Sequence, residues 1–423
     1  MINDRSLSRF APLGEHLLRP VYADYAFANI PRTIEALLTG ERGGPLLPAD
    51  CFGGSYPAPA KVVLFLIDSF GWAFWQRHAE RWPALRRIGE RGIVTPISAL
   101  FPSTTAASVT TINFGVPPAQ HALVEWNLYI EAYGEVIQSL PFVGLGRQPD
   151  NLQATKGYDP RHLLAAHETV YQRLAARGIP AIVFCGRDYA FSPFNRMAAT
   201  GAEVVAYSTL AEALLALRTR LEATTGPAYL YFYWPDIDAI AHTYGPNSRY
   251  HELEIANFWL TFAAVFDAPR RHADTLFLFT ADHGQVYGDP ARTVALNHAL
   301  PELVPALRRT PSGGLIYPTG SARDVFLHLQ PERVAEMRAR LSELLAGIAE
   351  VMSIDEALAL GLFGPPPYAA EFRRRLGDLL ILPYAGRYVW WHEPGVLENR
   401  FYGHHGGLAA DEVITVLAAT DEL

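Results

Sequence analysis

The chain has 423 residues, enough for one large or two ordinary domains with a substantial hydrophobic core. Half of the residues are hydrophobic and 18% are charged, a composition that excludes an intrinsically disordered chain. The formal net charge of −8 argues against a nonspecific binder of nucleic-acid polymers, because there is no surplus of basic residues to displace counterions.

The cysteine content and the hydropathy of the chain indicate the cellular compartment of the protein. Cys51 and Cys185 are the two cysteines, so at most one internal disulfide is possible, and their small number fits a reducing compartment. The first twenty residues carry charges throughout and lack an apolar run of signal-peptide length. Apolar runs such as 62–67 are too short to span a bilayer. These features predict a cytoplasmic protein without a membrane segment.

The first half of the chain begins as an irregular arm over residues 1–60, with one short helix near 31–38. Residues 61–68 then read as a buried parallel strand, because six apolar and mostly branched residues precede Asp68. A helical stretch over 72–91, interrupted at Pro83, follows this strand.

Strands and helices alternate up to residue 282. We expect strands at 93–98, 181–186, 204–207, 229–235 and 275–282, helices at 162–178, 210–223 and 251–266, a loop at 138–158, and a loop or helix start at 236–246. This alternation predicts an α/β fold: a doubly wound, mostly parallel sheet with helices on both faces.

The pattern changes after about residue 290. A strand at 320–329, a helix at 331–347, a further segment at 351–363 and an antiparallel pair formed by 378–384 and 387–391 predict a smaller α+β subdomain. We therefore expect a core over 1–300, an inserted α+β subdomain over 301–400, and a return to the core over 401–423.

One stretch of small residues suits an anion. Pro102 fixes φ, and Ser103, Thr104 and Thr105 are good N-cap residues for a helix that begins with small side chains. Because the start of a helix presents free N–H groups and the positive end of the dipole, a hydroxyl there can act as a nucleophile beside its own phosphate site. An ordinary capped helix is the alternative.

Four acid and histidine motifs offer metal ligands. Asp68 follows the first buried strand, Asp238 and His242 have the four-residue spacing that places them on one helix face, and Asp282 is adjacent to His283. The pair His404 and His405 lies between glycines. Each motif has an alternative explanation, namely a helix cap, a surface histidine or a flexible loop. At the ends of parallel strands, however, these groups can meet and hold two divalent ions.

In order along the chain, the motifs are LFLIDSFG, FPSTTAASVTTINFG, WPDIDAIAHTYGP, FLFTADHG and GHHGG, and they span residues 64–407. They resemble those of the alkaline phosphatase superfamily, and most closely its type I phosphodiesterase/nucleotide pyrophosphatase branch. The resemblance implies a metal-dependent hydrolase of phosphate esters that acts through a phosphothreonine intermediate.

The resemblance also implies roles for particular residues. Counting back ten residues from Gly115 places the nucleophile at Thr105, with Thr104 and Ser103 as rivals. One ion is then held by Asp68, Asp282 and His283 beside the Thr105 oxygen. The other ion is held by a set chosen over the neighbours Asp236 and His404: Asp238, His242 and His405. Zn²⁺ suits this mixed set and Mn²⁺ is possible.

Other positions in the motifs are less clear. His121 matches a family position and is interpreted as structural, while Tyr233 and Trp234 are expected to pack in the core rather than to stack on a nucleobase. The position of a phosphate-contacting asparagine in the pyrophosphatase branch falls on Trp126 here, so the neighbouring Asn127 is the candidate for that contact.

The substrate is expected to be a small-molecule phosphate ester, possibly a nucleotide. The arginine with which monoesterases of the superfamily grip phosphate is not identifiable, which favours diesters. The alternatives are a phosphomonoesterase, a phosphonate hydrolase, a phosphomutase, and more remotely a non-catalytic metal-binding protein. A membrane-bound phosphoethanolamine transferase is disfavoured by the lack of transmembrane segments, and a sulfatase by the settings of both cysteines. The oligomeric state stays open.

Overall fold

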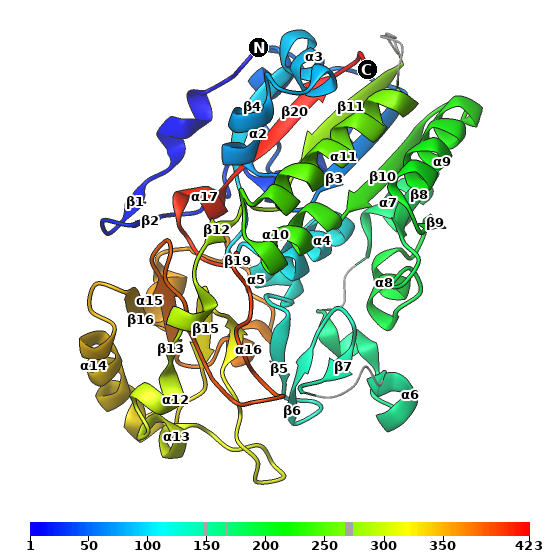
Figure 1. The fold of residues 1–423 in the computed structure, drawn as a ribbon. Helices are drawn as coiled ribbons and strands as arrows, with labels where there is room; N and C mark the ends of the chain where they lie inside the picture. Colours follow the sequence, from blue (N-terminus) through cyan, green and yellow to red (C-terminus); the bar gives the residue numbers. More distant parts are fainter. Residues whose placement is uncertain (147–150, 166–167, 267–273) are drawn as a thin grey trace.

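A seven-stranded sheet forms the centre of the computed structural model, which describes residues 1–146, 151–165, 168–266 and 274–423 (Figure 1). Its strand order is β4-β20-β11-β3-β10-β8-β9. The bounds are Ile93–Ser98 for β4, Ile414–Thr420 for β20, Thr275–Thr280 for β11, Lys61–Ile67 for β3, Ala228–Trp234 for β10, Ala181–Gly186 for β8 and Glu203–Tyr207 for β9. Only β20 runs antiparallel to its neighbours in this sheet, β4 and β11.

The two faces of the sheet are covered by different helices. In β3, Val63, Phe65 and Ile67 belong to one hydrophobic cluster and the alternating Val62, Leu64 and Leu66 to another. The first cluster includes residues of α2 (Trp72–His78), α3 (Pro83–Arg91), α9 (Leu210–Ala223) and α11 (Arg249–Val265). The second includes residues of α1 (Ile30–Thr39), α4 (Thr105–Phe114), α7 (Val170–Ala175) and α8 (Pro193–Ala198). The expected doubly wound, mostly parallel α/β fold is confirmed.

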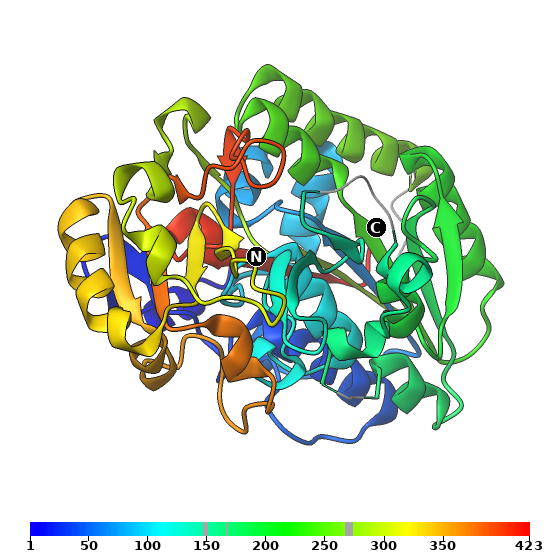
Figure 2. The same ribbon diagram turned by 90° about the horizontal axis from the view of Figure 1, so that it is seen from below.

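A second sheet lies beside the first, below it in Figure 1 and therefore nearer the viewer in Figure 2, which is seen from below. Its strand order is β16-β17-β15-β14-β5-β6-β7, and each described pairing in it is antiparallel. The bounds are Ala349–Ser353, Leu379–Pro383, Asp324–Leu327, Thr319–Ser321, Asn127–Ile130, Glu135–Gln138 and Val143–Gly144, in that order. The sheet thus takes strands from both sides of residue 300.

Short elements complete the described chain. Three two-stranded sheets pair β1 (Pro12–Leu13) with β2 (Leu17–Leu18), β12 (Val286–Tyr287) with β19 (Gly403–His404), and β13 (Val294–Ala295) with β18 (Val389–Trp390). The remaining helices are α5 (Pro118–His121), α6 (Leu152–Lys156), α10 (Asp236–Tyr244), α12 (Leu296–Ala299), α13 (Leu303–Ala306), α14 (Val334–Leu344), α15 (Ile354–Ala359), α16 (Phe372–Leu376) and α17 (Ala410–Val413). No helix among the described residues is both long and apolar enough to cross a bilayer.

Several expectations about local structure were wrong. The single strand expected at 320–329 is the hairpin β14–β15, in which Ser321 pairs with Asp324. The segment 378–384 does not pair with 387–391, because β17 lies between β15 and β16, whereas β18 runs parallel to β13. A turn in which the Arg387 N–H donates to the Tyr384 carbonyl redirects the chain, and Trp390 and Trp391 then pack in the same hydrophobic cluster as Leu379 and Ile381 of β17.

The helix expected at 162–178 is also different. A 3-10 turn over Pro160–Leu163 comes first, α7 begins at Val170, and residues 166–167 lie outside the described residues. Thr169 and Gln172 form a capping box that starts α7. The segment 138–158, expected to be a loop, contains β7 and α6.

Candidate metal centre

The predicted ligands gather where the strands of the large sheet end. Because β3, β10 and β11 are parallel, the segments that follow them start at the same edge of the sheet. Asp68 follows β3, α10 follows β10 and carries Asp238 and His242, and Asp282 with His283 follows β11.

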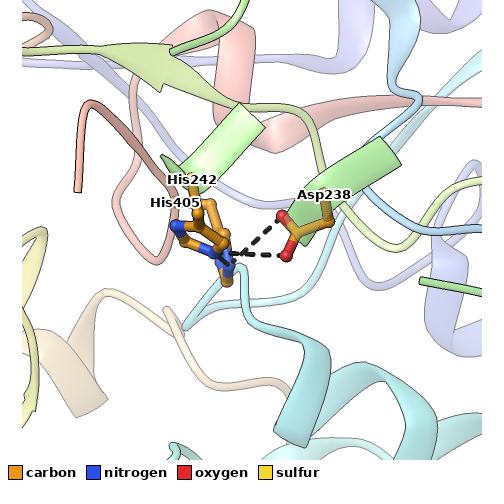
Figure 3. Close-up of side chains that lie close together, drawn as sticks. All are labelled: Asp238, His242 and His405. Carbon is orange, nitrogen blue, oxygen red and sulfur yellow. Dashed lines mark hydrogen bonds and ion pairs between the residues drawn. The ribbon is translucent and has the colours of Figure 1, made fainter. Parts of the chain in front are cut away.

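The first group of potential ligands consists of Asp238, His242 and His405, whose nitrogen and oxygen atoms lie within 4.8 Å of one another. His242 Nε2 lies 3.2 Å from Asp238 Oδ2 and 3.1 Å from His405 Nε2, and His405 Nε2 lies 3.7 Å from Asp238 Oδ1. Figure 3 shows both imidazoles pointing toward the carboxylate. His242 is fixed through Nδ1, 2.7 Å from the Gly403 carbonyl oxygen. His405 Nδ1 likewise faces a backbone carbonyl, so the Nε2 atoms of both rings are directed toward the carboxylate, where they could bind an ion.

The second group consists of Asp68, Asp238 and His283, also within 4.8 Å of one another. His283 Nε2 lies 3.6 Å from Asp68 Oδ1 and 3.4 Å from Asp282 Oδ2, so Asp282 borders this group. The backbone N–H groups of Ser69 and His283 both donate to Asp282 Oδ1 at 3.1 Å. The rings of His283 and His405 stack with centroids 3.7 Å apart, which places the two groups side by side.

Thr105 is the hydroxyl residue that faces the second group. Its Oγ1 lies 3.3 Å from Asp68 Oδ2 and 3.4 Å from His283 Nε2, at the first residue of α4. The rivals are occupied elsewhere: Thr104 caps α4 by accepting from the Ala107 N–H at 3.3 Å, and Ser103 Oγ donates to the Gly407 carbonyl at 2.9 Å. Thr105 alone of the three has its hydroxyl against metal-type ligands.

Burial and mutual proximity shift the pKa values of the site groups in both directions. Burial, together with Asp282 and Asp238, raises the pKa of Asp68 well above its usual range, and burial also raises the pKa of Asp282. Burial alone would raise the pKa of Asp238, but His242 and His405 hold it below its usual range. Burial and the neighbouring His283 lower the pKa of His405 well below its usual range, so this imidazole is neutral and offers a lone pair.

The surroundings of two buried carboxylate oxygen atoms indicate that a metal ion fits this site. Asp68 Oδ1 and Asp282 Oδ2 are fully buried and have no hydrogen-bond partner among the described residues. Leaving buried carboxylate oxygens without a partner is costly, and a divalent ion removes that cost. The donor set of carboxylate oxygens and imidazole nitrogens, all buried or nearly so, is one that binds such ions.

The loop that carries His405 is held from two sides. Ser103 Oγ accepts from the Gly406 N–H at 3.1 Å, and the Ser103 carbonyl lies 3.0 Å from His405 Nδ1. On the other side, Glu412 accepts from the Gly407 N–H at 3.1 Å and forms a fully buried ion pair with Arg323 at 2.7 Å. These contacts fix the second imidazole of the first group.

The other residues considered in the sequence lie outside these groups. Asp236 is exposed, and His404 Nδ1 lies 3.1 Å from its neighbour's carbonyl. His121 Nε2 lies 3.1 Å from Thr111 Oγ1, which agrees with a structural role. Asn127 Nδ2 donates to the Gly320 carbonyl at 3.1 Å, a contact within the second sheet.

Sequence reasoning missed two side chains that support the ligands. Tyr233 packs against the core and Trp234 is buried, both as expected, but the Tyr233 hydroxyl also donates to Asp68 Oδ2 at 2.6 Å. Gln285 Nε2 donates to Asp238 Oδ1 at 3.0 Å. The position of Gln285, two residues past His283, is a signal for such a role, because the turn that presents a ligand also presents its neighbours.

Replacing Asp68 by asparagine should stabilise the metal-free protein. The pKa of Asp68 is raised in the folded protein. The contribution of Asp68 to the free energy of unfolding is therefore fully present below the ordinary aspartate pKa and is lost as the pH rises through the raised pKa. Asp68→Asn removes that loss while keeping an acceptor for Tyr233. We expect a gain of about 1–2 kcal/mol at about pH 8, measured by thermal unfolding in chelator. The gain in stability should be smaller at about pH 5. An equal gain at the two pH values would contradict the raised pKa of Asp68 as its cause.

Comparisons with known proteins address the family and the fold of the chain. The family profile of type I phosphodiesterase/nucleotide pyrophosphatase matches residues 62–408. No curated protein matches the chain. Among solved structures, murine ectonucleotide pyrophosphatase/phosphodiesterase 5 is 14% identical with a TM-score of 0.60, over 85% of this chain and 87% of that chain.

Two further solved structures share the fold and contain ligands. An inactive threonine-to-alanine variant of the murine protein in complex with AMP has a TM-score of 0.59 at 14% identity, over 85% of this chain and 87% of that chain. Phosphonoacetate hydrolase from Sinorhizobium meliloti 1021, in complex with phosphonoacetate, has a TM-score of 0.60 at 18% identity, over 87% of this chain and 92% of that chain. From the family match over most of its length, the chain belongs to the type I phosphodiesterase/nucleotide pyrophosphatase family, and it is a phosphoric ester hydrolase of the alkaline phosphatase superfamily.

Proposed function

We propose that this enzyme hydrolyses small-molecule phosphodiesters, with Thr105 as the nucleophile and two divalent ions as cofactors. The observation that carries the proposal is the position of Thr105 Oγ1, 3.3 Å from Asp68 Oδ2 and 3.4 Å from His283 Nε2, at the first residue of α4. The inactive AMP-bound variant of the murine relative, in which a threonine is replaced by alanine, supports a threonine in this role.

The two ions are proposed to be Zn²⁺, with Mn²⁺ as the alternative, because both groups mix imidazole and carboxylate ligands. Asp68, Asp282 and His283 would hold one ion beside Thr105, and Asp238, His242 and His405 would hold the other. When bound, divalent ions act as Lewis acids that favour an ionised hydroxyl and neutralise charge on the oxygens of phosphate.

The protein supplies orientation and a covalent intermediate. Asp68 accepts the hydrogen bond of the Thr105 hydroxyl and so fixes the direction of the oxygen. The Thr105 hydroxyl loses its proton to solvent and its oxygen bonds to phosphorus as the bond from phosphorus to the leaving oxygen breaks; the departing alkoxide then takes up a proton from solvent and leaves as the alcohol. Water then cleaves the phosphothreonine bond and restores the hydroxyl. Thr105 is the first residue of α4, so the N–H groups at the start of this helix would stabilise the phosphate oxygens.

A phosphonate hydrolase is the second candidate. The observation in its favour is the fold shared with phosphonoacetate hydrolase, at a TM-score of 0.60. A nucleotide diester is the preferred substrate class because the murine relative binds AMP and the family match is to nucleotide pyrophosphatases. Asn127 remains the proposed phosphate contact, and its side chain would have to leave the Gly320 carbonyl to make it.

A side-by-side assay tests the proposed function. The Zn²⁺-loaded enzyme is given bis-p-nitrophenyl phosphate, p-nitrophenyl phosphate and phosphonoacetate at equal concentration. We expect kcat/KM for the diester to exceed that for the monoester by about tenfold or more. Monoesterases of the superfamily grip phosphate with an arginine, whereas in the described part of the chain the site carboxylates form ion pairs with histidines rather than arginines. Faster release of phosphate from phosphonoacetate would instead favour the phosphonate hydrolase.

A further inference from the structure

Three chain segments that carry proposed metal ligands are packed together through their backbones. The ligands are Asp68 in the turn after β3, Asp282 and His283 in the turn after β11, and His405 in the loop between β19 and α17. Because the ligands of one ion come from different segments, the spacing of the segments sets the distances between the ligands. The atoms at which the segments touch therefore bear on metal binding.

Gly71 ends the turn after β3 and is packed against the turn after β11. A Cβ at Gly71 would lie 2.9 Å from Gly284 Cα, 3.0 Å from Gly284 N and 3.0 Å from the His283 carbonyl oxygen. The φ of Gly71 is −70°, a value that any residue adopts, so no left-handed conformation calls for glycine here. The close approach of the two backbones does call for it.

Gly284, directly after His283, makes a closer contact on its other side. A Cβ at Gly284 would lie 2.0 Å from the Asp411 carbonyl oxygen in α17. The Gly284 N–H donates to the next carbonyl of that helix, at Glu412, over a distance of 3.1 Å. The turn after β11 is therefore held between the turn after β3 and α17.

Gly407, two residues after His405, meets the same helix. Its N–H donates to Glu412 Oε1 at 3.1 Å, and a Cβ at Gly407 would lie 2.9 Å from Glu412 Oε2. The Glu412 carboxylate is itself held in place, because it pairs with the buried guanidinium of Arg323 at 2.7 Å. The φ angles of Gly284 and Gly407 lie outside the left-handed region, so close approach is again what excludes a side chain.

Hydrogen bonds and ring contacts join the same segments. The Ser69 N–H, next to Asp68 in the chain, donates to Asp282 Oδ1 at 3.1 Å. The rings of His283 and His405 stack with centroids 3.7 Å apart. In such a closely packed arrangement, a shift of one backbone segment moves the carboxylates and imidazoles that it carries.

We propose that Gly71, Gly284 and Gly407 are positioning residues of the metal centre: without side chains, they let the three segments approach until ligands from different segments reach one small ion. A methyl group at Gly71 pushes the turn after β3 away from the turn after β11 and so lengthens the distances from Asp68 to the ligands there. The inference rests on the proposed function in taking the acids and histidines of the three segments as metal ligands.

The test compares three glycine-to-alanine variants. Gly71→Ala adds one methyl group at the contact between the two turns. Gly92→Ala is the matched control for strain, because its φ is −104° and a Cβ there would lie 2.4 Å from the Ala419 carbonyl oxygen. That contact lies between the start of β4 and β20, outside the segments that carry ligands. Gly89→Ala is the control without strain, since no atom outside its own helix lies within 4 Å of a Cβ at Gly89.

The measurements are the affinities for Zn²⁺ and for Cd²⁺, a larger ion of the same charge, by competition with a chromophoric chelator, together with thermal unfolding in chelator. We expect Gly71→Ala to lower the Zn²⁺ affinity by about 10–100-fold, the usual effect of losing support for metal ligands. Its Cd²⁺ affinity should fall less, because longer metal–ligand distances suit the larger ion. Gly92→Ala should unfold at a lower temperature than wild type but keep both affinities, and Gly89→Ala should also keep both.

Gly407→Ala is the second variant if Gly71→Ala does not fold. Its added methyl group meets the end of the Glu412 side chain rather than backbone atoms, so the change is milder. It should displace the loop that carries His405 and lower the Zn²⁺ affinity more than the Cd²⁺ affinity.

Unchanged Zn²⁺ affinity in Gly71→Ala, or in Gly407→Ala where that variant is used, would overturn the inference. An equal loss in Gly92→Ala would overturn it as well, because metal affinity would then follow the general strain of the fold. A wild type that binds no Zn²⁺ would instead contradict the proposed metal centre, and this result is recognised before any variant is made.

Discussion

Thr105→Ala should abolish diester hydrolysis while leaving the metals in place. We expect kcat for bis-p-nitrophenyl phosphate to fall by about 10³-fold or more, because the variant lacks the oxygen that bonds to phosphorus. The carboxylates and imidazoles that surround Thr105 are unchanged, and each keeps partners other than Thr105, such as the Tyr233 hydroxyl on Asp68 at 2.6 Å. Metal content should therefore stay at two per chain.

The neighbouring threonine is the matched control. Thr104 caps α4 and donates to the Val124 carbonyl at 3.2 Å, so Thr104→Ala costs about 1 kcal/mol of stability but keeps the reacting hydroxyl. We expect its turnover to stay within about tenfold of wild type. Thr105→Ser should retain measurable activity. If Thr105→Ala retained more than about a tenth of the wild-type kcat, the nucleophile would be a different group.

Asp238→Asn should have the largest effect on metal binding. Asp238 is the residue shared by the two groups of potential ligands, with Oδ2 3.2 Å from His242 Nε2 and Oδ1 3.7 Å from His405 Nε2. The substitution removes one negative charge from a cluster that would hold two dications, while the shape of the side chain and an acceptor for Gln285 are kept. We expect metal content to fall to one per chain or fewer and diester turnover to fall by about 10³-fold.

Asp236→Asn on the same helix is the control for this effect. Asp236 is exposed and lies in the first turn of α10, so the change in net charge is the same but the carboxylate lost is outside both groups. Metal content and turnover should stay close to wild type. Two tightly bound metals in Asp238→Asn would contradict the assignment of Asp238 as a ligand.

The large sheet and the positions of the acids were predictable because they follow from local sequence. Runs of branched apolar residues such as 62–67, bounded by turn signals, favour buried strands, and an acid directly after such a strand is placed by the strand itself. The four-residue spacing of Asp238 and His242 likewise fixes their relation on α10 without knowledge of the rest of the chain.

The contacts that surround the ligands were not predictable, because each joins residues far apart in the chain. Tyr233 meets Asp68 across neighbouring strands, and Ser103 meets the Gly406 N–H from the far side of the sequence. The prediction that 387–391 pairs with 378–384 was wrong for the same reason. A short strand after a turn pairs with whichever strand edge the tertiary fold brings near, and for β18 that is β13.

The place of β20 in the large sheet has a consequence for how the protein folds. β4 is joined to the other strands of that sheet only through β20, which pairs with β4 on one side and with β11 on the other. A ribosome that has synthesised the chain as far as residue 400 has made β4 and β11 but nothing to fill the gap between them. Closing such a gap late requires contacts over a long sequence separation, which slows folding and leaves strand edges open to association with other chains. The facing edges of β4 and β11 therefore stay unpaired in the emerging polypeptide until Ile414–Thr420 is available.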